Sequence, residues 1–393
     1  MTPAARVQAA IELLDQVIAA AQDNGAPADR VIAQGLRERR YAGSKDRRAI
    51  RDLAYAAIRA CGPLPANGRA AMLRLAGLDS PLEDLFDGSD YGPARIGPDD
   101  LAADGGIAPP WLEAKLAASG IAGDEALALL TRAPLDLRVN TLRASRDGLE
   151  LPIEGEVLAT PNGLRFPNGT QVEQWAAYHG GAIEVQDCGS QVACMAVGAQ
   201  PGETVIDLCA GAGGKTLALA AAMENRGTLV AADTDRNRLS KLAPRAERAG
   251  AAIAETALLD PNREREALAA WIGGADAVLV DAPCSGTGTW RRNPEARWRL
   301  DPAQLQRLTA LQSYLLDLAA ELVRPGGHLT YVTCSLLDEE GRDQIERFLA
   351  VNSDWQAEPL TLPLGSECGK GIRLTPHRDG TDGFFIARLF RAC

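Results

Sequence analysis

The sequence predicts an α/β protein whose C-terminal half is a doubly wound parallel sheet. From about residue 183 onward, short apolar segments alternate with segments of helical length, which is typical of a parallel sheet covered by helices on both faces. The expected strands are residues 204–210, 228–233, 252–259, 277–283 and 328–334. The segment GFFIARLF, residues 383–390, is apolar on both faces and has no helix after it, so we expect it to pair antiparallel at the sheet edge.

The residues before this sheet divide into three expected regions. Residues 1–60 have helical periodicity and predict a helical domain. Residues 61–134 begin with loops rich in Gly, Pro and Asp and continue into a pair of helices. Residues 135–182 contain short strand-like segments such as DLRVNTL and GLRFPNG, which indicate a small α/β subdomain. The large sheet and its helices then occupy residues 183–393.

The composition is that of a globular protein. The 393 residues include 46% hydrophobic and 24% charged residues, enough for a large core. No apolar run is long enough to span a membrane and the N-terminus lacks the pattern of a signal peptide, so we expect a cytoplasmic protein. The net charge and the absence of an obvious aggregation-prone segment favour a monomer. The eight cysteines include no CxxC pair and the three histidines are scattered, so we expect free thiols and no metal site.

The charge pattern contains evidence for and against nucleic acid as a partner. The net charge of −11 repels phosphate at long range. Residues 37–51, however, carry seven cations and two acids, and residues 290–299 carry four cations and one acid. The second segment also contains Trp290 and Trp298, and arginines interleaved with aromatic residues suit a groove for phosphates and stacked bases. Either segment taken alone is more often a solvated helix face.

The first candidate ligand site is DLCAGAGGKT, residues 207–216, which leads from an expected strand into a helix. Its glycines permit a tight turn and a close approach of the backbone to a ligand. The next expected strand ends at Asp233, where an acid suits the hydroxyls of a ribose. A phosphate-binding loop of an ATPase is an alternative, because Gly214-Lys215-Thr216 ends like a Walker A motif, although Cys209 stands where that motif needs glycine.

Two cysteines follow two further expected strands. Cys284 lies in DAPCSGTG, residues 281–288, and Cys334 lies in the tripeptide TCS. The carboxyl ends of parallel strands meet at the edge of the sheet where ligands bind, so both thiols are expected beside the glycine loop. With Asp281 three residues before Cys284, this pair predicts covalent catalysis. A single buried cysteine, by contrast, is usually only a small apolar side chain.

Together these motifs resemble the Sun-type RNA cytosine-5 methyltransferases, whose bacterial members include 16S ribosomal RNA methyltransferases. DLCAGAGGKT, AADTDRNRL, DAPCSGTGTWRRNP and TCSLLDEEG are similar to the family's first, second, fourth and sixth motifs, and DGFFIARL to its closing strand. The resemblance covers residues 135–393, and SKDRRAIRDLAY within residues 1–60 is similar to a short NusB-like RNA-binding domain. The family usually has Ala-Pro where this chain has Gly211-Ala212.

The resemblance implies a Rossmann-like class I methyltransferase fold with S-adenosylmethionine as cofactor. It implies that 5-methylcytosine is formed in RNA, with ribosomal RNA the preferred substrate and transfer RNA the second. Cys334 would be the nucleophile that adds to carbon 6 of cytosine, Asp281 would bind and activate the base, and Cys284 would assist product release. The alternatives from other classes are the ATPase, an RNA-binding factor without catalysis, and an amino-methyltransferase.

The remaining expected contacts form two sets. The cofactor would contact Cys209, Ala210, Gly211, Ala212, Gly213, Gly214, Lys215, Asp233, Asp260 and Asp281. The RNA would contact Trp290, Arg291, Arg292 and Asn293 beside the base, and Arg39, Arg40, Arg47 and Arg48 along its phosphates.

Overall fold

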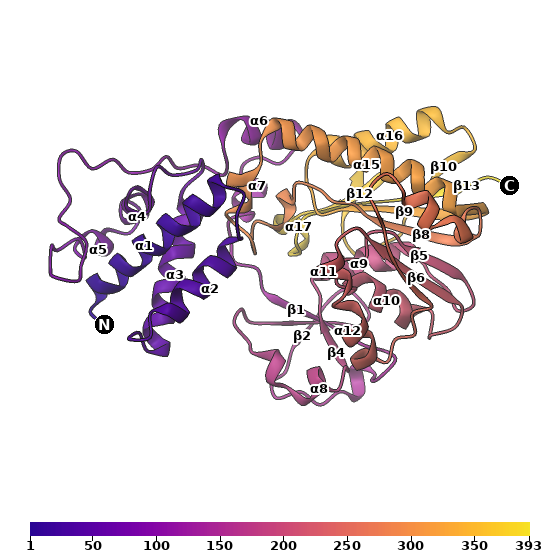
Figure 1. Ribbon diagram of the computed structural model, residues 1–393, viewed down its shortest axis with the longest axis horizontal. Coiled ribbons are helices and arrows are strands. Elements are labelled where there is room, and N and C mark those ends of the chain that lie inside the picture. The colour runs from indigo at the N-terminus through magenta and orange to yellow at the C-terminus, as the bar shows by residue number, and fades with distance from the viewer. The chain divides into compact units, whose positions relative to one another are not determined.

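The computed structural model describes residues 1–393, and the chain folds as two compact units (Figure 1). The first unit contains Met1–Thr131 together with Thr289–Asp301. The second contains Arg132–Gly288 and Pro302–Cys393. The sequence predicted neither the continuity of the first unit across residue 60 nor the inclusion of a segment from the C-terminal half. No helix combines the length and the apolar character needed to cross a membrane.

The first unit is helical. Its helices are α1 (Pro3–Gln22), α2 (Ala28–Glu38), α3 (Ser44–Ala60), α4 (Gly68–Ala76), α5 (Ser80–Glu83), α6 (Pro110–Ala118), α7 (Asp124–Ala128) and α14 (Ala296–Arg299). Thr2 caps α1 by accepting a hydrogen bond from the Ala5 amide, and Pro3 opens the helix, where its missing N–H costs nothing. Apolar faces of α1, α3 and α4 then bury a common core.

Residues 289–301 are built into this helical unit. The Arg297 guanidinium is fully buried and donates to the carbonyls of Ile58 and Cys61, each at 2.7 Å. Trp298 Nε1 donates to the Gly62 carbonyl at 3.1 Å, and its ring belongs to the helical core. These contacts satisfy carbonyl groups at the end of α3, which would otherwise be orphaned.

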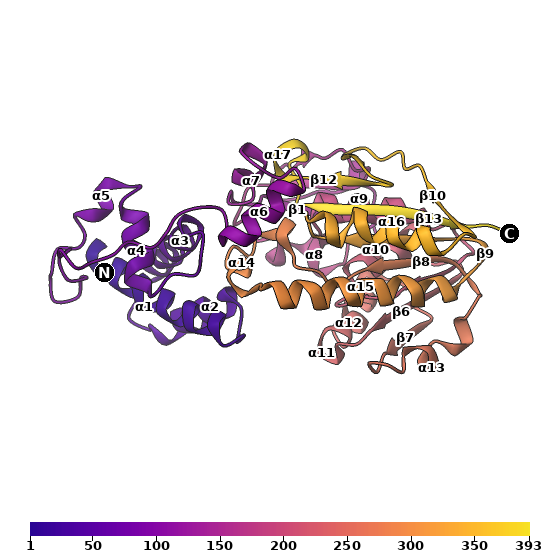
Figure 2. The same cartoon turned by 90° about the horizontal axis from the view of Figure 1, so that it is seen from above.

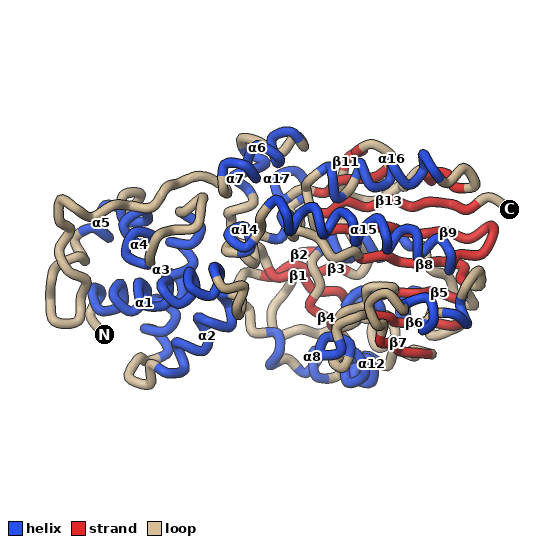
Figure 3. The backbone as a smooth tube through the Cα atoms, turned by 45° about the horizontal axis from the view of Figure 1, so that its top comes forward, coloured by secondary structure: helices blue, strands red, loops and turns tan.

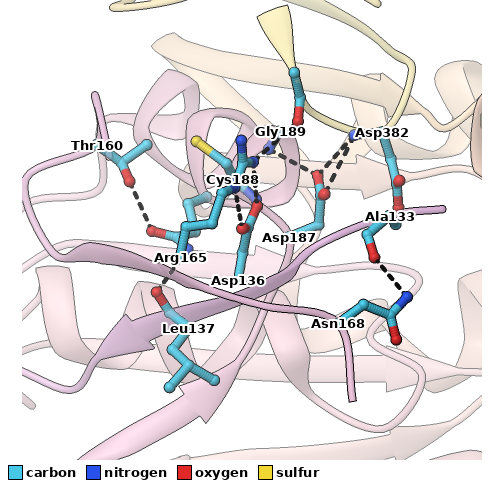
Figure 4. Close-up of polar contacts among 12 residues, drawn as sticks. Ala133, Asp136, Leu137, Thr160, Arg165, Asn168, Asp187, Cys188, Gly189 and Asp382 are labelled. Carbon is cyan, nitrogen blue, oxygen red and sulfur yellow. Dashed lines mark hydrogen bonds and ion pairs between the residues drawn. The ribbon is translucent and has the colours of Figure 1, made fainter. Parts of the chain in front are cut away.

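The second unit begins with a small antiparallel sheet. Its strands are β1 (Leu135–Val139), β2 (Glu156–Val157), β3 (Gly163–Phe166) and β4 (Ile183–Val185), in the order β2-β3-β1-β4. The buried Asp136 carboxylate accepts two hydrogen bonds from Arg165, at 2.7 and 2.9 Å, and one from the Cys188 amide at 3.0 Å (Figure 4). The small sheet is thereby tied to the helix that begins at Cys188.

The large sheet has nine strands, shown in red in Figure 3. They are β5 (Thr204–Asp207), β6 (Thr228–Asp233), β7 (Glu255–Leu258), β8 (Ala275–Asp281), β9 (Val323–Thr333), β10 (Trp355–Glu358), β11 (Ser366–Cys368), β12 (Gly371–Leu374) and β13 (Phe384–Arg391). Eight of them follow the order β11-β12-β13-β9-β8-β5-β6-β7, the ninth, β10, pairs with β13, and the pairs among β5 to β9 are parallel. The predicted α/β class is confirmed.

Helices cover both faces of this sheet. They are α9 (Cys188–Val197), α10 (Gly214–Ala222), α11 (Arg236–Leu239), α12 (Leu242–Ala249), α13 (Glu264–Ala267), α15 (Pro302–Leu322), α16 (Arg342–Val351) and α17 (Pro376–Asp379), and α8 (Ala176–His179) accompanies the small sheet. Alternate residues of a strand face opposite sides: Ile206 packs in the core that includes α15 and α16, whereas Val205 packs with α9 and α10. Because they are buried on both faces, β5, β6 and β8 are almost wholly apolar.

The position of the closing strand corrects the expectation from the sequence. β13 does pair antiparallel with β9, from Phe385 opposite Thr333 to Phe390 opposite His328. It does not lie at the edge, because β12 and β10 pair with its other side (Figure 2). β11 in turn pairs with β12 and lies beyond it. Those three strands are short and only partly buried, so they lack the apolar runs that revealed the others.

Candidate active site

The glycine loop between β5 and α10 is closely packed on one side and open on the other. Gly211 and Gly213 have φ angles of 55° and 87°, which side chains disfavour. A Cβ atom at Gly211 would lie 2.5 Å from the Arg238 guanidinium, and one at Gly213 would lie 2.1 Å from Leu242. A Cβ atom at Gly214 would meet nothing within 4 Å. The N-terminus of α10 therefore faces open space, which fits a bound ligand.

Two of the expected cofactor acids differ in their surroundings. Asp233, buried at the end of β6, accepts hydrogen bonds from the amides of Gly211 and Asp235, each at 2.7 Å. It thus fixes the glycine loop against the neighbouring strand. Asp260 follows β7 and is exposed. The structure therefore brings Asp233 to the loop, and it leaves the Asp260 carboxylate facing solvent.

Asp207 ends β5 and is fully buried. One of its oxygens accepts a hydrogen bond from the Thr216 hydroxyl at 2.7 Å, while the other has no partner. Burial raises the pKa of Asp207 to about 7, and the nearby Asp281 carboxylate adds to this rise. The loop is thus anchored at its base by a carboxyl group that is half protonated near neutral pH.

Lys215 connects the glycine loop to the end of β8. Its Nζ lies 2.6 Å from Oδ2 of Asp281 and 5.7 Å from the centre of the Phe384 ring. Burial alone would lower the pKa of Lys215, but the adjacent Asp281 carboxylate outweighs it and raises the pKa above its ordinary value. Lys215 stays charged, and the ion pair fixes the direction of the Asp281 carboxylate.

The two expected catalytic cysteines are neighbours. Cys284 Sγ lies 3.3 Å from Cys334 Sγ, although 50 residues separate them in sequence. The Gly288 amide donates to the Cys334 carbonyl at 3.0 Å, which holds the two loops together. The hydrogen bond to Cys334 and burial both raise the pKa of Cys284 well above its ordinary value. Cys284 is therefore a protonated thiol at neutral pH.

Glu340 is an important residue that the sequence analysis did not single out. It is fully buried and accepts hydrogen bonds from the Ser285 amide at 2.8 Å, the Ser335 hydroxyl at 2.5 Å and the Gln312 amide at 2.9 Å. The Ser285 hydroxyl also donates to it. Because Ser285 follows Cys284 and Ser335 follows Cys334, one carboxylate joins both cysteine loops. An acid a few residues after TCS was the available signal.

The residues expected to contact RNA all lie in the helical unit, but some of them are buried and others are exposed. Trp290 is fully buried, Arg291 nearly so, and the Arg291 carbonyl accepts from Arg59 at 3.2 Å. Arg39 is also buried, where it pairs with Glu12 at 2.8 Å and donates to the Gly35 carbonyl. Arg47 and Arg292 are partly exposed, and the exposed members are Arg40, Arg48 and Asn293.

The sequence of this chain matches a described family. The family "16S rRNA methyltransferase RsmB/F" matches residues 194–390, which include the glycine loop and both cysteines. The chain belongs to the RsmB/F family. The resemblance to Sun-type methyltransferases is thereby confirmed, and the expected cofactor, S-adenosylmethionine, is that of the family.

Two relatives and one solved structure show how far the likeness extends. This RsmB/F chain is 38% identical over 270 residues to the "Probable ribosomal RNA small subunit methyltransferase B" of Synechocystis sp., covering 66% of this chain and 60% of the relative. It is 35% identical over 300 residues to ribosomal RNA small subunit methyltransferase B of Xanthomonas campestris pv. campestris, covering 72% and 66%. The chain thus spans less than two thirds of their length. The crystal structure of PH0851 superposes with a TM-score of 0.75 and 27% identity over 99% of both chains.

Proposed function

We propose that this chain methylates carbon 5 of a cytosine in 16S ribosomal RNA, with S-adenosylmethionine as methyl donor. The observation that carries the proposal is the 3.3 Å approach of the Cys284 and Cys334 thiols beside the Lys215–Asp281 ion pair. Two thiols and a fixed carboxylate at the carboxyl ends of β8 and β9 suit the methylation of a carbon that is itself a poor nucleophile. Names of the relatives support ribosomal RNA as the substrate.

The cofactor would occupy the open side of the glycine loop. When bound, S-adenosylmethionine supplies an electrophilic methyl group. Backbone groups of residues 209–215 would hold its methionine part, because Gly214 leaves space at the start of α10. Asp233 would accept hydrogen bonds from the ribose hydroxyls in addition to those it accepts from the loop. Asp260 would lie beside the adenine.

Cys334 would begin the reaction by adding its sulfur to carbon 6 of the target cytosine. This addition breaks the aromaticity of the ring and makes carbon 5 nucleophilic. The Asp281 carboxylate, oriented by its ion pair with Lys215, would bind the edge of the cytosine ring. There it would stabilise the charge that develops on the ring nitrogen. After methyl transfer a water molecule takes the proton from carbon 5, the electrons of that carbon–hydrogen bond re-form the ring double bond, and the carbon–sulfur bond breaks with Cys334 leaving as a thiolate. Cys284, at 3.3 Å from Cys334, would assist this release.

RNA would be gripped by the exposed cations of the helical unit. Arg40, in the turn after α2, and Arg48, on α3, are exposed to solvent and suit contacts with backbone phosphates. Asn293 would contact RNA directly, whereas Trp290 and Arg39 would act by holding this surface in shape. The net charge of −11 implies that RNA binding depends on such local contacts and weakens as salt rises.

Methyl transfer from labelled S-adenosylmethionine to RNA transcripts tests the proposal. The substrates are unmodified 16S ribosomal RNA, partly assembled small ribosomal subunits and a mixture of transfer RNAs, and the products are analysed as nucleosides. We expect label in 5-methylcytosine from 16S ribosomal RNA, free or assembled. Label only in transfer RNA would keep the chemistry and change the substrate. Label in any other nucleoside, or no binding of S-adenosylmethionine, would overturn the proposal.

A further inference from the structure

Arg138 on β1 is a buried cation without an acidic partner. Arg138 is only 6% exposed, and its guanidinium makes no ion pair. Its Nε donates to the Gln186 side chain at 2.7 Å, whereas Nη2 has no hydrogen-bond partner. A guanidinium remains charged at neutral pH, and a buried charge without a counter-charge is costly. The fold therefore contains an uncompensated positive charge.

The carboxylate opposite Arg138 in the small sheet is already occupied. Glu184 lies directly opposite Arg138 in the antiparallel pair of β1 and β4. Its Oε2 accepts from Arg245 at 2.7 Å and its Oε1 accepts from Arg248. One buried carboxylate thus faces three guanidinium groups, and the two on α12 take both of its oxygens. Arg138 is left as the surplus cation of this cluster.

A pocket of about 130 Å³ adjoins Arg138. Thr141, Asn162, Cys194 and Ala222 are among the residues that line it, and none of the lining residues is acidic. A single ordered water needs only roughly 10–15 Å³, so the pocket has room for a larger polar group. A hydroxyl and an amide beside a guanidinium are hydrogen-bond donors that together suit a tetrahedral oxyanion.

We propose that this pocket binds a phosphate group, with Arg138 as its principal ligand. The phosphate supplies the counter-charge that the Arg138 cluster lacks, and its oxygens accept from Arg138, Thr141 and Asn162. The group is either inorganic phosphate or a phosphodiester of bound RNA. This site is separate from the cysteines and the glycine loop, and it does not depend on the proposed methyl transfer.

Thermal unfolding of the full chain tests for the site. Inorganic phosphate replaces chloride at constant ionic strength, and Tm is followed as phosphate rises. At phosphate concentrations about tenfold above its dissociation constant, we expect Tm to rise by roughly 3–6 °C. Arg138→Gln should lose this rise. The matched control is Arg226→Gln, which removes the same charge at an exposed position and should keep it.

A second pair of variants keeps the test decisive if Arg138→Gln does not fold. Ala222 is exposed at the pocket wall, so Ala222→Asp places a carboxylate there and Ala222→Asn serves as its uncharged match. In chloride, the Asp variant should have the higher Tm of the two, and phosphate should raise the Tm of the Asn variant only. Equal phosphate effects in both variants would overturn the proposal.

Binding of an RNA oligonucleotide distinguishes the two sources of the phosphate group, an RNA phosphodiester and free inorganic phosphate. A short oligonucleotide without terminal phosphates offers phosphodiesters alone. If Arg138→Gln weakens its binding and inorganic phosphate competes with it in the unsubstituted protein, the site takes an RNA phosphodiester. If oligonucleotide binding is unchanged, the site takes free phosphate. A Tm that responds to phosphate and chloride equally, or a phosphate effect that survives in Arg138→Gln, would show that no such site exists.

Discussion

The ammonium of Lys215 lies 2.6 Å from the carboxylate of Asp281, although 66 residues separate them in sequence. Lys215 belongs to the first turn of α10 and Asp281 to the last position of β8, so this contact connects the glycine loop with the strand that leads to Cys284. This ion pair joins the proposed cofactor site to the proposed site of the target base. A shift of Lys215 in the cofactor site would therefore also move Asp281 beside the base.

Loss of this ion pair should affect catalysis more than folding. In Lys215→Met the Asp281 carboxylate loses its fixed direction, so we expect kcat to fall by about 10–100-fold, the usual effect of misplacing a catalytic group. Lys215→Arg keeps the charge and is expected to restore part of the activity. Steady-state methyl transfer measures both variants. Unchanged kcat in Lys215→Met would show that the pair has no part in the reaction.

The cysteine roles predict opposite behaviour of two alanine variants. Cys334→Ala removes the proposed nucleophile and should lower turnover by at least about a thousandfold. Cys284→Ala removes the group proposed to assist product release and should accumulate a covalent RNA–protein adduct. Denaturing gel electrophoresis with labelled RNA detects the adduct. An adduct formed by Cys334→Ala instead would reverse the assignment.

Glu340 is expected to act as a positioning residue for the two cysteine loops. Glu340→Gln replaces one accepting oxygen by an amide nitrogen, so a hydrogen bond from Ser285 or Ser335 is lost, at a cost of about 1–3 kcal/mol. We expect kcat to fall while KM changes little, and Cys284 and Cys334 to be oxidised to a disulfide more slowly by diamide. Glu339→Gln, at the neighbouring residue, is the control. Loss of stability with unchanged kcat and oxidation rate would contradict a positioning role.

The buried Asp207 predicts a pH dependence of stability. Its pKa is about 7 in the folded protein and near 3.8 when unfolded. Between about pH 4 and pH 7 the folded state keeps a proton that the unfolded state has released, so the free energy of unfolding falls as pH rises, by at most about 4 kcal/mol. Asp207→Asn should flatten this part of the profile, measured by urea unfolding. Asp260→Asn, at an exposed site, should leave it unchanged, and identical profiles for all three proteins would refute the assignment.

Exposed and buried arginines of the helical unit should respond differently to substitution. Replacing Arg40 and Arg48 together by Gln should weaken RNA binding and reduce the slope of log affinity against log salt by roughly 1.5–2, without changing Tm. Arg39→Gln should instead lower Tm, because Arg39 is buried against Glu12 and the Gly35 carbonyl. Filter binding at several salt concentrations and thermal unfolding separate the two effects. A salt slope that stays the same in the double variant would remove this surface from the proposal.

The sequence could predict those features that depend on local pattern. Strands β5, β6, β8 and β9 were visible because strands buried on both faces are runs of apolar residues. The glycine loop was visible because its turn needs residues without a Cβ atom. The meeting of Cys284 and Cys334 followed from their places at the ends of neighbouring parallel strands.

Features that depend on long-range contacts were not predictable in the same way. Strands β10, β11 and β12 are short and partly exposed, so no apolar run marks them. The burial of Trp298 depends on packing in the helical core, whose other members lie more than 200 residues earlier in the chain. An arginine such as Arg297 looks like a surface residue until the carbonyls of Ile58 and Cys61 are known to satisfy it.

The inclusion of Thr289–Asp301 in the helical unit has a consequence for biosynthesis. Because Arg297 is 239 residues from the Ile58 carbonyl that it binds, a nascent chain emerging from the ribosome cannot complete the helical core while only its first 131 residues are available. Strands β5 to β8 are translated before that last piece arrives. The N-terminal helices therefore lack Trp298 in their core until residues 289–301 are made, and the second unit is completed only after residues 302–393 have followed.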